Sequence, residues 1–225
     1  MMQGYGMTEN SPIIAVNQDR YGKAASVGKP MPGTEVRIVD DDESGIGEVI
    51  CKGPSVMMGY YKDAENTAKT IKDGWLYTGD YGYLDEDGFL YITGRKKNVI
   101  VTKGGKNIFP EEVEYYLLLS DFISEVIVYG KHEEVKGDLI CTAIMYPDYT
   151  ALENAGCATD EEKYRKLKEA VEEANSKMPP FKRVKRIEIR EDDFIKTTTL
   201  KIKRFEEENY DYKFDDRDFE KGRRF

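Results

Sequence analysis

The sequence has few of the residues that build imidazole, thiol and disulfide chemistry. Its 225 residues include one histidine, His132, and three cysteines, Cys51, Cys141 and Cys157, which form no CxxC pair. This count disfavours a His-based mechanism, a zinc site and a disulfide framework. Isolated cysteines of this kind are typical of a reducing compartment, so we expect a cytoplasmic protein.

Long apolar runs and an excess of positive charge are also lacking. No apolar run approaches 18 residues, so the sequence predicts no membrane span. The net charge is -9 and the pI is about 4.9, which argues against a non-specific nucleic-acid surface. Apolar residues still make up 40% of the chain, enough for one large or two small packed domains.

The first part of the chain, to about residue 94, reads as β-rich. Alternating stretches at 34–40 and 44–53 predict strands, and residues 81–94 predict a hairpin whose turn contains Gly88. Glycine and proline recur throughout this part, which suits a distorted barrel or a bent sheet.

The character of the sequence changes at Arg95. The stretch "FPEEVEYYLLLS" predicts a helix with Pro110 in its first turn, and Thr159 with Glu162 predicts a capping box for a helix to about residue 178. Apolar strands flank both helices. We therefore predict an α+β chain with two domains, residues 1–94 and 95–225, the second ending in a charged tail that reads as a helix followed by a frayed end.

Near the start, the stretch "GYGMTE" has the composition of a turn beside a ligand. Gly4 and Gly6 permit close backbone approach and Tyr5 offers a flat stacking face. Thr8 can donate to an anionic oxygen, and Glu9 can hold a hard cation. An ordinary glycine-rich turn explains the same residues.

Three later stretches could also carry chemistry. Asp80, in "WLYTGDYG", can accept two ribose hydroxyls or simply cap a turn after a strand. "GRKKNVIVTKGGKN" is the most basic local patch and can face phosphates or solvent. Lys201, in "TTTLKIKR", can stabilise developing negative charge or lie in an unremarkable basic loop.

Taken in order, "YGMTE", "SVGKPMPG", "GEVICKGPSVMMGYYKD", "DGWLYTGDYGYLDEDGFLYITGRKKNVIVTKGGKNIFPEEVE" and "TTTLKIKR" resemble the second half of an adenylate-forming enzyme. That superfamily contains acyl-CoA synthetases, luciferases and the adenylation domains of peptide synthetases. The amino-acid sequences of the last two motifs are most similar to those of the long-chain fatty acid–CoA ligases. The resemblance runs from residue 3 to about residue 205.

The resemblance implies a two-step reaction with ATP, Mg²⁺ and CoA. A carboxylate attacks the α-phosphate of ATP and pyrophosphate leaves; the CoA thiol then takes the acyl group and AMP leaves. By the motif, Lys201 would bridge the carboxylate and the phosphate during the first step. Lys97 would be the hinge of a mobile C-terminal lid, and Gly104 and Gly105 would line the path of the pantetheine arm.

The nucleotide contacts follow from the same resemblance. Tyr5 would stack on adenine, with Gly6 beside it, and Thr8 would contact the α-phosphate. Glu9 would bind Mg²⁺. Asp80 and Arg95 would hold the ribose.

Two departures from the family pattern accompany the resemblance. Many relatives have proline and glycine around the lysine, where this chain has Ile195 and Leu200, and many have aspartate where it has Lys97. The phosphate loop and most of the acyl pocket of the family also have no counterpart in these 225 residues. We therefore expect a C-terminal portion that is inactive alone and that self-associates through apolar surface on residues 1–30 normally covered by the missing N-terminal half.

Other interpretations remain open at this point. The chain could come from an aryl-CoA ligase or a peptide-synthetase adenylation domain. It could also be a stand-alone, non-catalytic module that reuses the lid fold to bind a nucleotide or a partner.

Overall fold

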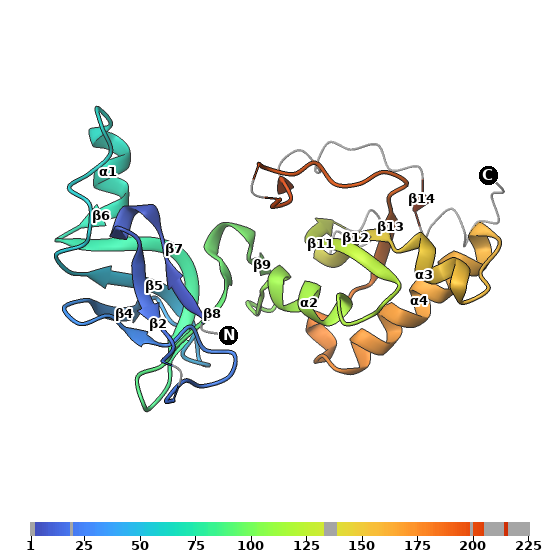
Figure 1. Ribbon diagram of the computed structural model, residues 1–225, viewed down its shortest axis with the longest axis horizontal. Helices are drawn as coiled ribbons and strands as arrows, with labels where there is room; N and C mark the ends of the chain where they lie inside the picture. Colours follow the sequence, from blue (N-terminus) through green and yellow to red (C-terminus); the bar gives the residue numbers. More distant parts are fainter. Residues whose placement is uncertain (1–2, 19, 133–138, 199, 205–213, 216–225) are drawn as a thin grey trace. The chain divides into compact units, whose positions relative to one another are not determined.

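The computed structural model describes residues 3–18, 20–132, 139–198, 200–204 and 214–215. The chain divides into two compact units, Met1–Lys97 and Asn98–Phe225 (Figure 1). The division lies three residues beyond the boundary predicted at 94/95. Both units contain strands and helices, so the predicted α+β class is confirmed. None of the described helices has the length and apolar character needed to cross a bilayer.

Unit 1 is built from two antiparallel sheets rather than one closed barrel, as far as its described residues extend. A three-stranded sheet has the order β1-β2-β3, and a larger sheet has the order β4-β5-β7-β6 with β8 paired to β7. The strands are β1 (Gly4–Gly6), β2 (Ile13–Val16), β3 (Lys29–Pro30), β4 (Glu35–Val39), β5 (Gly47–Lys52), β6 (Ile71–Lys72), β7 (Trp75–Leu84) and β8 (Leu90–Arg95); a 3-10 helix η1 (Thr8–Asn10) and helix α1 (Ala64–Thr70) complete the unit.

The core of unit 1 forms around strand β2, which is buried on both faces. Ile14 packs with Cys51 and Leu76, whereas Ala15 packs with a second cluster that includes Leu90. Because successive side chains of a strand point to opposite faces, this strand joins two apolar layers. It thereby fixes β1, which pairs with it.

The predicted hairpin is strands β7 and β8, in register from Leu84 opposite Leu90. Gly88 has φ 78°, as predicted for the turn. The Asp85 carboxylate accepts from the backbone N–H groups of Asp87 and Phe89 at 3.0 and 2.9 Å, so one side chain organises the turn.

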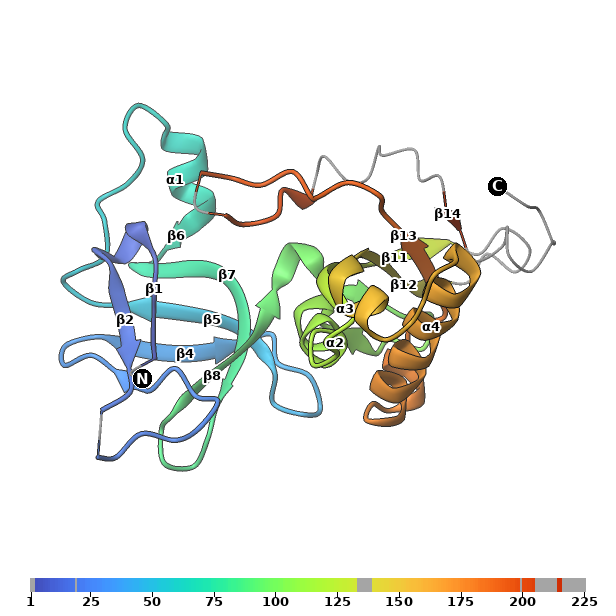
Figure 2. The same cartoon turned by 45° about the vertical axis from the view of Figure 1, so that its right-hand side comes forward.

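Unit 2 is a sheet with helices on one face (Figure 2). The four described strands of this sheet have the order β11-β12-β13-β14, with β12 and β13 parallel and the other pairs antiparallel. Strands β9 and β10 pair separately as a short antiparallel sheet. The elements are η2 (Lys96–Asn98, at the division), β9 (Ile100–Val101), β10 (Asn107–Ile108), α2 (Pro110–Leu117), β11 (Ile123–His132), β12 (Leu139–Pro147), α3 (Tyr149–Asn154), α4 (Asp160–Ser176), η3 (Pro180–Lys182), β13 (Arg186–Ile189) and β14 (Phe214–Asp215).

The two faces of this sheet bury different partners. Val126 and Val128 of β11 pack in the cluster that includes residues of α2 and α4. Ile127, between them, points to the other face and packs with Ile144 and Phe194, with Ile202 against them. The segment after β13 therefore covers the face that the helices leave open.

The predicted helix signals at α2 and α4 are confirmed. Pro110 opens α2, and Thr159 and Glu162 form the capping box of α4. The short helices α1 and α3 were not predicted, although Asp63 and Asp148 cap their N-termini by accepting backbone N–H groups. The predicted helix and frayed tail at the charged end lie outside the described residues, except for strand residues 214–215.

Candidate nucleotide site

Asp80 is a buried acid within strand β7. The sequence predicted a turn at this residue, and that prediction is wrong because Asp80 lies inside the strand β7, Trp75–Leu84. Residues 78–80 of β7 bulge opposite Val49 of β5, with Gly79 at φ 70°. The Thr78 hydroxyl donates to the Val49 carbonyl at 2.7 Å and accepts from the Asp80 N–H at 3.1 Å. Thr78 and Asp80 follow the alternating burial of β7 and so share its buried face.

Two side chains from distant parts of unit 1 meet the Asp80 carboxylate. The Tyr5 hydroxyl donates to Oδ2 at 2.6 Å, and Arg95 Nε lies 2.7 Å from Oδ1. Asp80 is 6% exposed while Arg95 is 54% exposed, so the acid is held in the interior with its cation at the surface. Burial, and next the charge of Asp80, raises the pKa of Tyr5 well above its ordinary value, so the hydroxyl stays a donor.

A second ion pair lies directly beside the first. Lys96 Nζ lies 2.6 Å from Oε2 of Glu48, which is 4% exposed and accepts from the Gly79 N–H at 3.3 Å. The hydrogen bond to Glu48 raises the pKa of Lys96. The last residue of β8 and the first residue of η2 therefore pair with buried acids on β7 and β5. Glu48 was not predicted as a site residue, because nothing in its strand pattern marks a buried polar residue.

The Gly4-Tyr5-Gly6 segment is the short strand β1, so the predicted turn is wrong here as well. Glycine at position 6 is required by space rather than by an unusual φ. A Cβ at Gly6 would lie 1.9 Å from the Pro12 carbonyl oxygen, whereas one at Gly4 would meet nothing closer than 3.5 Å. The close approach to Pro12 places Tyr5 where its hydroxyl meets Asp80.

Thr8 and Glu9 lie in η1, which follows β1 directly. Glu9 Oε1 accepts from the Tyr60 hydroxyl at 2.9 Å, and the Glu9 carbonyl accepts from the Met57 N–H at 2.8 Å. No cluster of three or more metal-binding side chains occurs in the part of the chain that the structure describes. A single carboxylate fits Mg²⁺ that is held mainly by substrate phosphates and water.

The predicted hinge and pantetheine residues lie around the start of unit 2. Lys97 is in η2, and the division between the units falls directly after it. Gly104 and Gly105 form the turn between β9 and β10, where the Gly105 N–H donates to the Thr102 carbonyl at 2.9 Å and Gly105 has φ 74°.

Gly104 also lines a hollow of about 250 Å³ within unit 2 that the sequence analysis missed. Lys103, Arg183 and Lys185 contribute to its lining, and Phe181 adds an aromatic ring. Its three cationic side chains suit an anionic ligand. The Phe181 ring itself faces Lys106 Nζ at 4.7 Å and Lys182 Nζ at 5.7 Å. The dense basic stretch at 182–186 is the feature of the sequence that could have indicated this hollow.

Lys201 lies on a hairpin whose described arms are residues 195–198 and 200–203. The Lys203 N–H donates to the Ile195 carbonyl at 2.9 Å, and the Thr197 N–H donates to the Lys201 carbonyl at 2.8 Å. The Lys201 N–H in turn donates to the Thr197 hydroxyl at 3.1 Å. Leu200 has φ 60° and is 80% exposed.

The structure thus joins Tyr5, Asp80 and Arg95 into one cluster, with Gly6 and η1 alongside it in unit 1. Lys201, Gly104 and Gly105 belong to unit 2 and are described within that unit alone.

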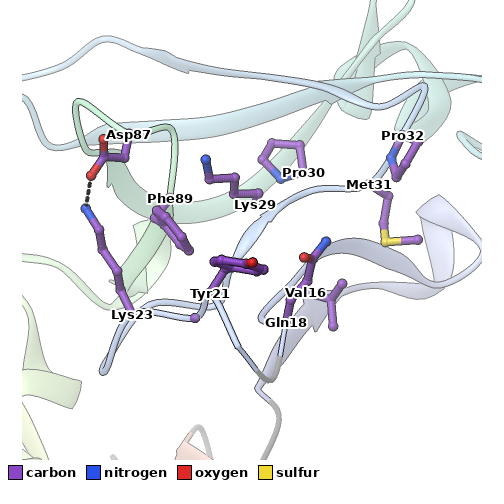
Figure 3. Close-up of a pocket in the computed structure, with 11 residues that line it drawn as sticks. Val16, Gln18, Tyr21, Lys23, Lys29, Pro30, Met31, Pro32, Asp87 and Phe89 are labelled. Carbon is purple, nitrogen blue, oxygen red and sulfur yellow. Dashed lines mark hydrogen bonds and ion pairs between the residues drawn. The ribbon is translucent and has the colours of Figure 1, made fainter.

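A separate hollow of about 540 Å³ lies at the far end of the β7–β8 hairpin from Asp80. Figure 3 shows Lys23 reaching Asp87 at its margin, with Tyr21, Lys29 and Phe89 around it. Lys23 pairs with both Asp85 and Asp87 at 2.6 Å, and none of the predicted nucleotide residues lines this hollow.

Comparison with known families assigns the chain to a class. Residues 1–61 match the model of the AMP-binding enzyme family, and residues 97–209 match the model of the AMP-binding enzyme C-terminal domain. The chain belongs to this adenylate-forming family, and the predicted resemblance is confirmed.

Its relatives include acyl- and aryl-CoA ligases. A long-chain-fatty-acid–CoA ligase from Bacillus subtilis is 36% identical over 211 residues, which cover 91% of this chain and 35% of that enzyme. A 2-succinylbenzoate–CoA ligase from Geobacillus sp. is 40% identical over 148 residues, covering 63% and 30% respectively. The chain therefore spans about a third of the length of these relatives.

Among solved structures, o-succinylbenzoate coenzyme A synthetase from Bacillus subtilis in complex with AMP matches with a TM-score of 0.76 and 28% identity, covering 94% of this chain and 41% of that chain. A structure of the same enzyme with ATP and a magnesium ion matches with a TM-score of 0.75 and 29% identity, covering 92% and 41%.

Proposed function

We propose that this chain supplies the ribose-holding wall and the mobile lid of an ATP-dependent, AMP-forming acyl-CoA ligase. The observation that carries the proposal is the Asp80 carboxylate, buried and oriented by Tyr5 and Arg95. A carboxylate held in this way can accept two vicinal hydroxyls without reorganising. Of the expected partners, ATP, a carboxylic acid and CoA are the substrates, and AMP is a product. The N-terminal half of the enzyme is the structural partner.

In the first step, an oxygen of the substrate carboxylate forms a bond to the α-phosphorus, and the bond to pyrophosphate breaks. Negative charge gathers at the α-phosphate, where Lys201 would pair with it and with the carboxylate. Thr8 would donate to the same phosphate, and Glu9 would hold Mg²⁺, which supplies charge neutralisation when bound.

In the second step, the sulfur of CoA attacks the acyl carbonyl carbon, and AMP leaves. We propose that a swivel at Lys97 exchanges the Lys201 face of the lid for the Gly104-Gly105 face between the two steps. Gly104 lines the basic hollow of unit 2, whose lysine and arginine side chains are suited to the phosphates of CoA.

A long-chain fatty acid is the favoured substrate because the relatives matched over 91% of the chain include a long-chain ligase. An aryl carboxylate is the second candidate. The 40% identical relative from Geobacillus sp. is named for 2-succinylbenzoate, and the AMP-bound structural neighbour is named for the same acid. Neither assignment follows from the described residues, because they do not form an acyl pocket.

The deciding experiment is ATP–pyrophosphate exchange by the protein expressed from the complete reading frame, with a panel of fatty and aryl carboxylic acids. Lys201→Ala is expected to reduce exchange by roughly 10²-fold or more. The same variant should convert added acyl-adenylate and CoA to thioester at the unmodified rate. An equal loss in both half-reactions would contradict the role given to Lys201. The 225-residue chain alone is expected to release no AMP or thioester with any fatty acid.

A further inference from the structure

The Lys201 hairpin is fixed to unit 2 at both ends. On the incoming side, Phe194 is 4% exposed and packs with Ile127 and Ile144 on the face of the sheet opposite the helices. Lys196, two residues later, lies 2.6 Å from Glu125 and 2.9 Å from Asp193. These contacts hold the first arm of the hairpin.

On the outgoing side, Arg204 reaches around the edge of the sheet. Its Nη2 lies 2.7 and 2.5 Å from the two carboxylate oxygens of Glu114, which belongs to α2 on the helix face. Its Nη1 donates to the Val128 carbonyl at 3.3 Å. The second arm is therefore tied to an element on the opposite side of the sheet.

Glu114 completes this junction with a third contact. Its Oε1 accepts from the Val128 N–H at 2.7 Å, so Glu114 and Arg204 together take both backbone polar groups of Val128. Strand β11 is the terminal strand of the described sheet, which is why these groups are available to side chains. Glu114 is 8% exposed. Burial raises the pKa of Glu114, and the charge of Arg204 opposes that effect.

We propose that Glu114 is a positioning residue for Lys201, acting through Arg204 to hold the outgoing arm of the hairpin. The inference rests on the proposed role of Lys201. Arg204 follows Lys201 by three residues, so movement of Arg204 would displace the loop that carries the lysine. Glu114 would touch neither substrate nor nucleotide. Its effect comes from geometry, since displacement of a reacting group by about 1 Å can cost about 10²-fold in rate.

The first test needs no activity. The 225-residue chain is digested briefly with trypsin, and cleavage after Lys201 is followed by intact mass. Glu114→Gln is expected to speed this cleavage about tenfold, because a neutral amide cannot pair both oxygens with Arg204. Arg204→Lys is the second variant: it keeps the charge but has a single nitrogen in place of the two that contact Glu114 and the Val128 carbonyl. Glu169→Gln, in the exposed pair with Lys166, is the matched control and should cleave like the wild type.

The second test uses the protein from the complete reading frame. Glu114→Gln should lower kcat for ATP–pyrophosphate exchange about 10- to 100-fold with little change in KM for ATP, and should spare thioester formation from added acyl-adenylate. The double variant Glu114→Gln with Arg204→Gln should lose no more exchange activity than the more impaired of the two single variants Glu114→Gln and Arg204→Gln. Both substitutions act through the same contact.

The outcomes separate cleanly. Unchanged cleavage after Lys201 in both Glu114→Gln and Arg204→Lys overturns the inference. Equal losses in both half-reactions also overturn it, since they would show general destabilisation of unit 2. Failure of the proposed function reads differently: the wild-type protein shows no exchange, while Glu114→Gln is still cut faster. That result would confirm that Glu114 holds the Lys201 hairpin through Arg204, and it would overturn the role of this contact in adenylation.

Discussion

The hydroxyl of Tyr5 donates to the Asp80 carboxylate at 2.6 Å across 75 positions of the sequence. The contact joins the first strand of the chain to the centre of β7. It also compensates a charge that is almost wholly buried, together with Arg95. Unit 1 contains Trp75, the only tryptophan of the chain, so its fluorescence reports on this unit.

Tyr5→Phe removes the hydroxyl and leaves Asp80 one donor short. Because hydrogen bonds to charged groups contribute about 1.5–3 kcal/mol, the free energy of unfolding of unit 1 should fall by about that amount. Urea titration followed by Trp75 fluorescence measures it. Tyr60→Phe is the matched control: its hydroxyl donates to Glu9 at an exposed position, and its loss should cost about 0.5 kcal/mol or less. Equal losses of unfolding free energy in the two variants would contradict the stabilising role given to the Tyr5–Asp80 hydrogen bond.

Gly6→Ala tests the close approach of β1 to Pro12. A Cβ 1.9 Å from the Pro12 carbonyl oxygen forces the backbone apart, so unit 1 should lose about 1–3 kcal/mol of unfolding free energy. Gly4→Ala in the same strand has room, with 3.5 Å to the nearest atom, and should be close to neutral. The same urea titration compares them, and a neutral Gly6→Ala would show that β1 is not held as described.

Leu200→Gly tests the left-handed backbone beside Lys201. A leucine at φ 60° carries roughly 1–2 kcal/mol of strain that glycine lacks, although glycine gains entropy in the unfolded chain. The net expectation is unchanged or slightly higher stability of unit 2. Thr198→Gly, at a residue without a positive φ, should instead lose about 0.5–1 kcal/mol. Thermal unfolding followed by circular dichroism distinguishes the two, and equal destabilisation would contradict the strain argument.

The Lys23–Asp85 pair predicts a dependence of stability on acid. The hydrogen bond from Lys23 lowers the pKa of Asp85 in the folded chain. The folded state therefore binds fewer protons than the unfolded state, and this contribution is present above the ordinary aspartate pKa of about 3.9 and lost as pH falls through the lowered value. Asp85→Asn should make the loss of unit 1 stability below about pH 4 shallower, as judged by Trp75 fluorescence.

Lys23→Met provides the check on that prediction. It leaves the acid in place and removes the largest of the interactions that lower its pKa, while the backbone N–H groups of Asp87 and Phe89 still donate to it. The acid-dependent loss should therefore shrink, but less than in Asp85→Asn. A slope that stays as steep as in the wild type in both variants would show that other carboxylates cause the acid sensitivity.

Local sequence signals were sufficient where neighbouring residues determine the conformation. The capping box of Thr159 and Glu162 and the turn at Gly88 are contacts within a few residues, and both were predicted correctly. The short helices α1 and α3 were missed because they bury few side chains and so show little apolar periodicity; only one buried residue, Leu152, lies in either.

The candidate site depended on contacts that a linear pattern does not contain. Asp80 was selected as a ribose ligand, but the bulge beside it and its pairing with Tyr5 arise from contacts among β1, β5 and β7. Glu48 gave no signal at all, since a glutamate in a strand is normally solvent-facing. The motifs together indicated the correct enzyme family. Their order along the chain is specific to that family, whereas no single motif is.

The junction at Val128 has a consequence for how copies of the protein meet. A terminal strand with open N–H and C=O groups is a template for another chain to add to the sheet. At Val128 those groups are already taken by Glu114 and Arg204, one from each side of the sheet. The same two side chains that tether the lysine hairpin therefore block strand addition at the middle of β11, so loosening them exposes a surface on which aggregation can begin.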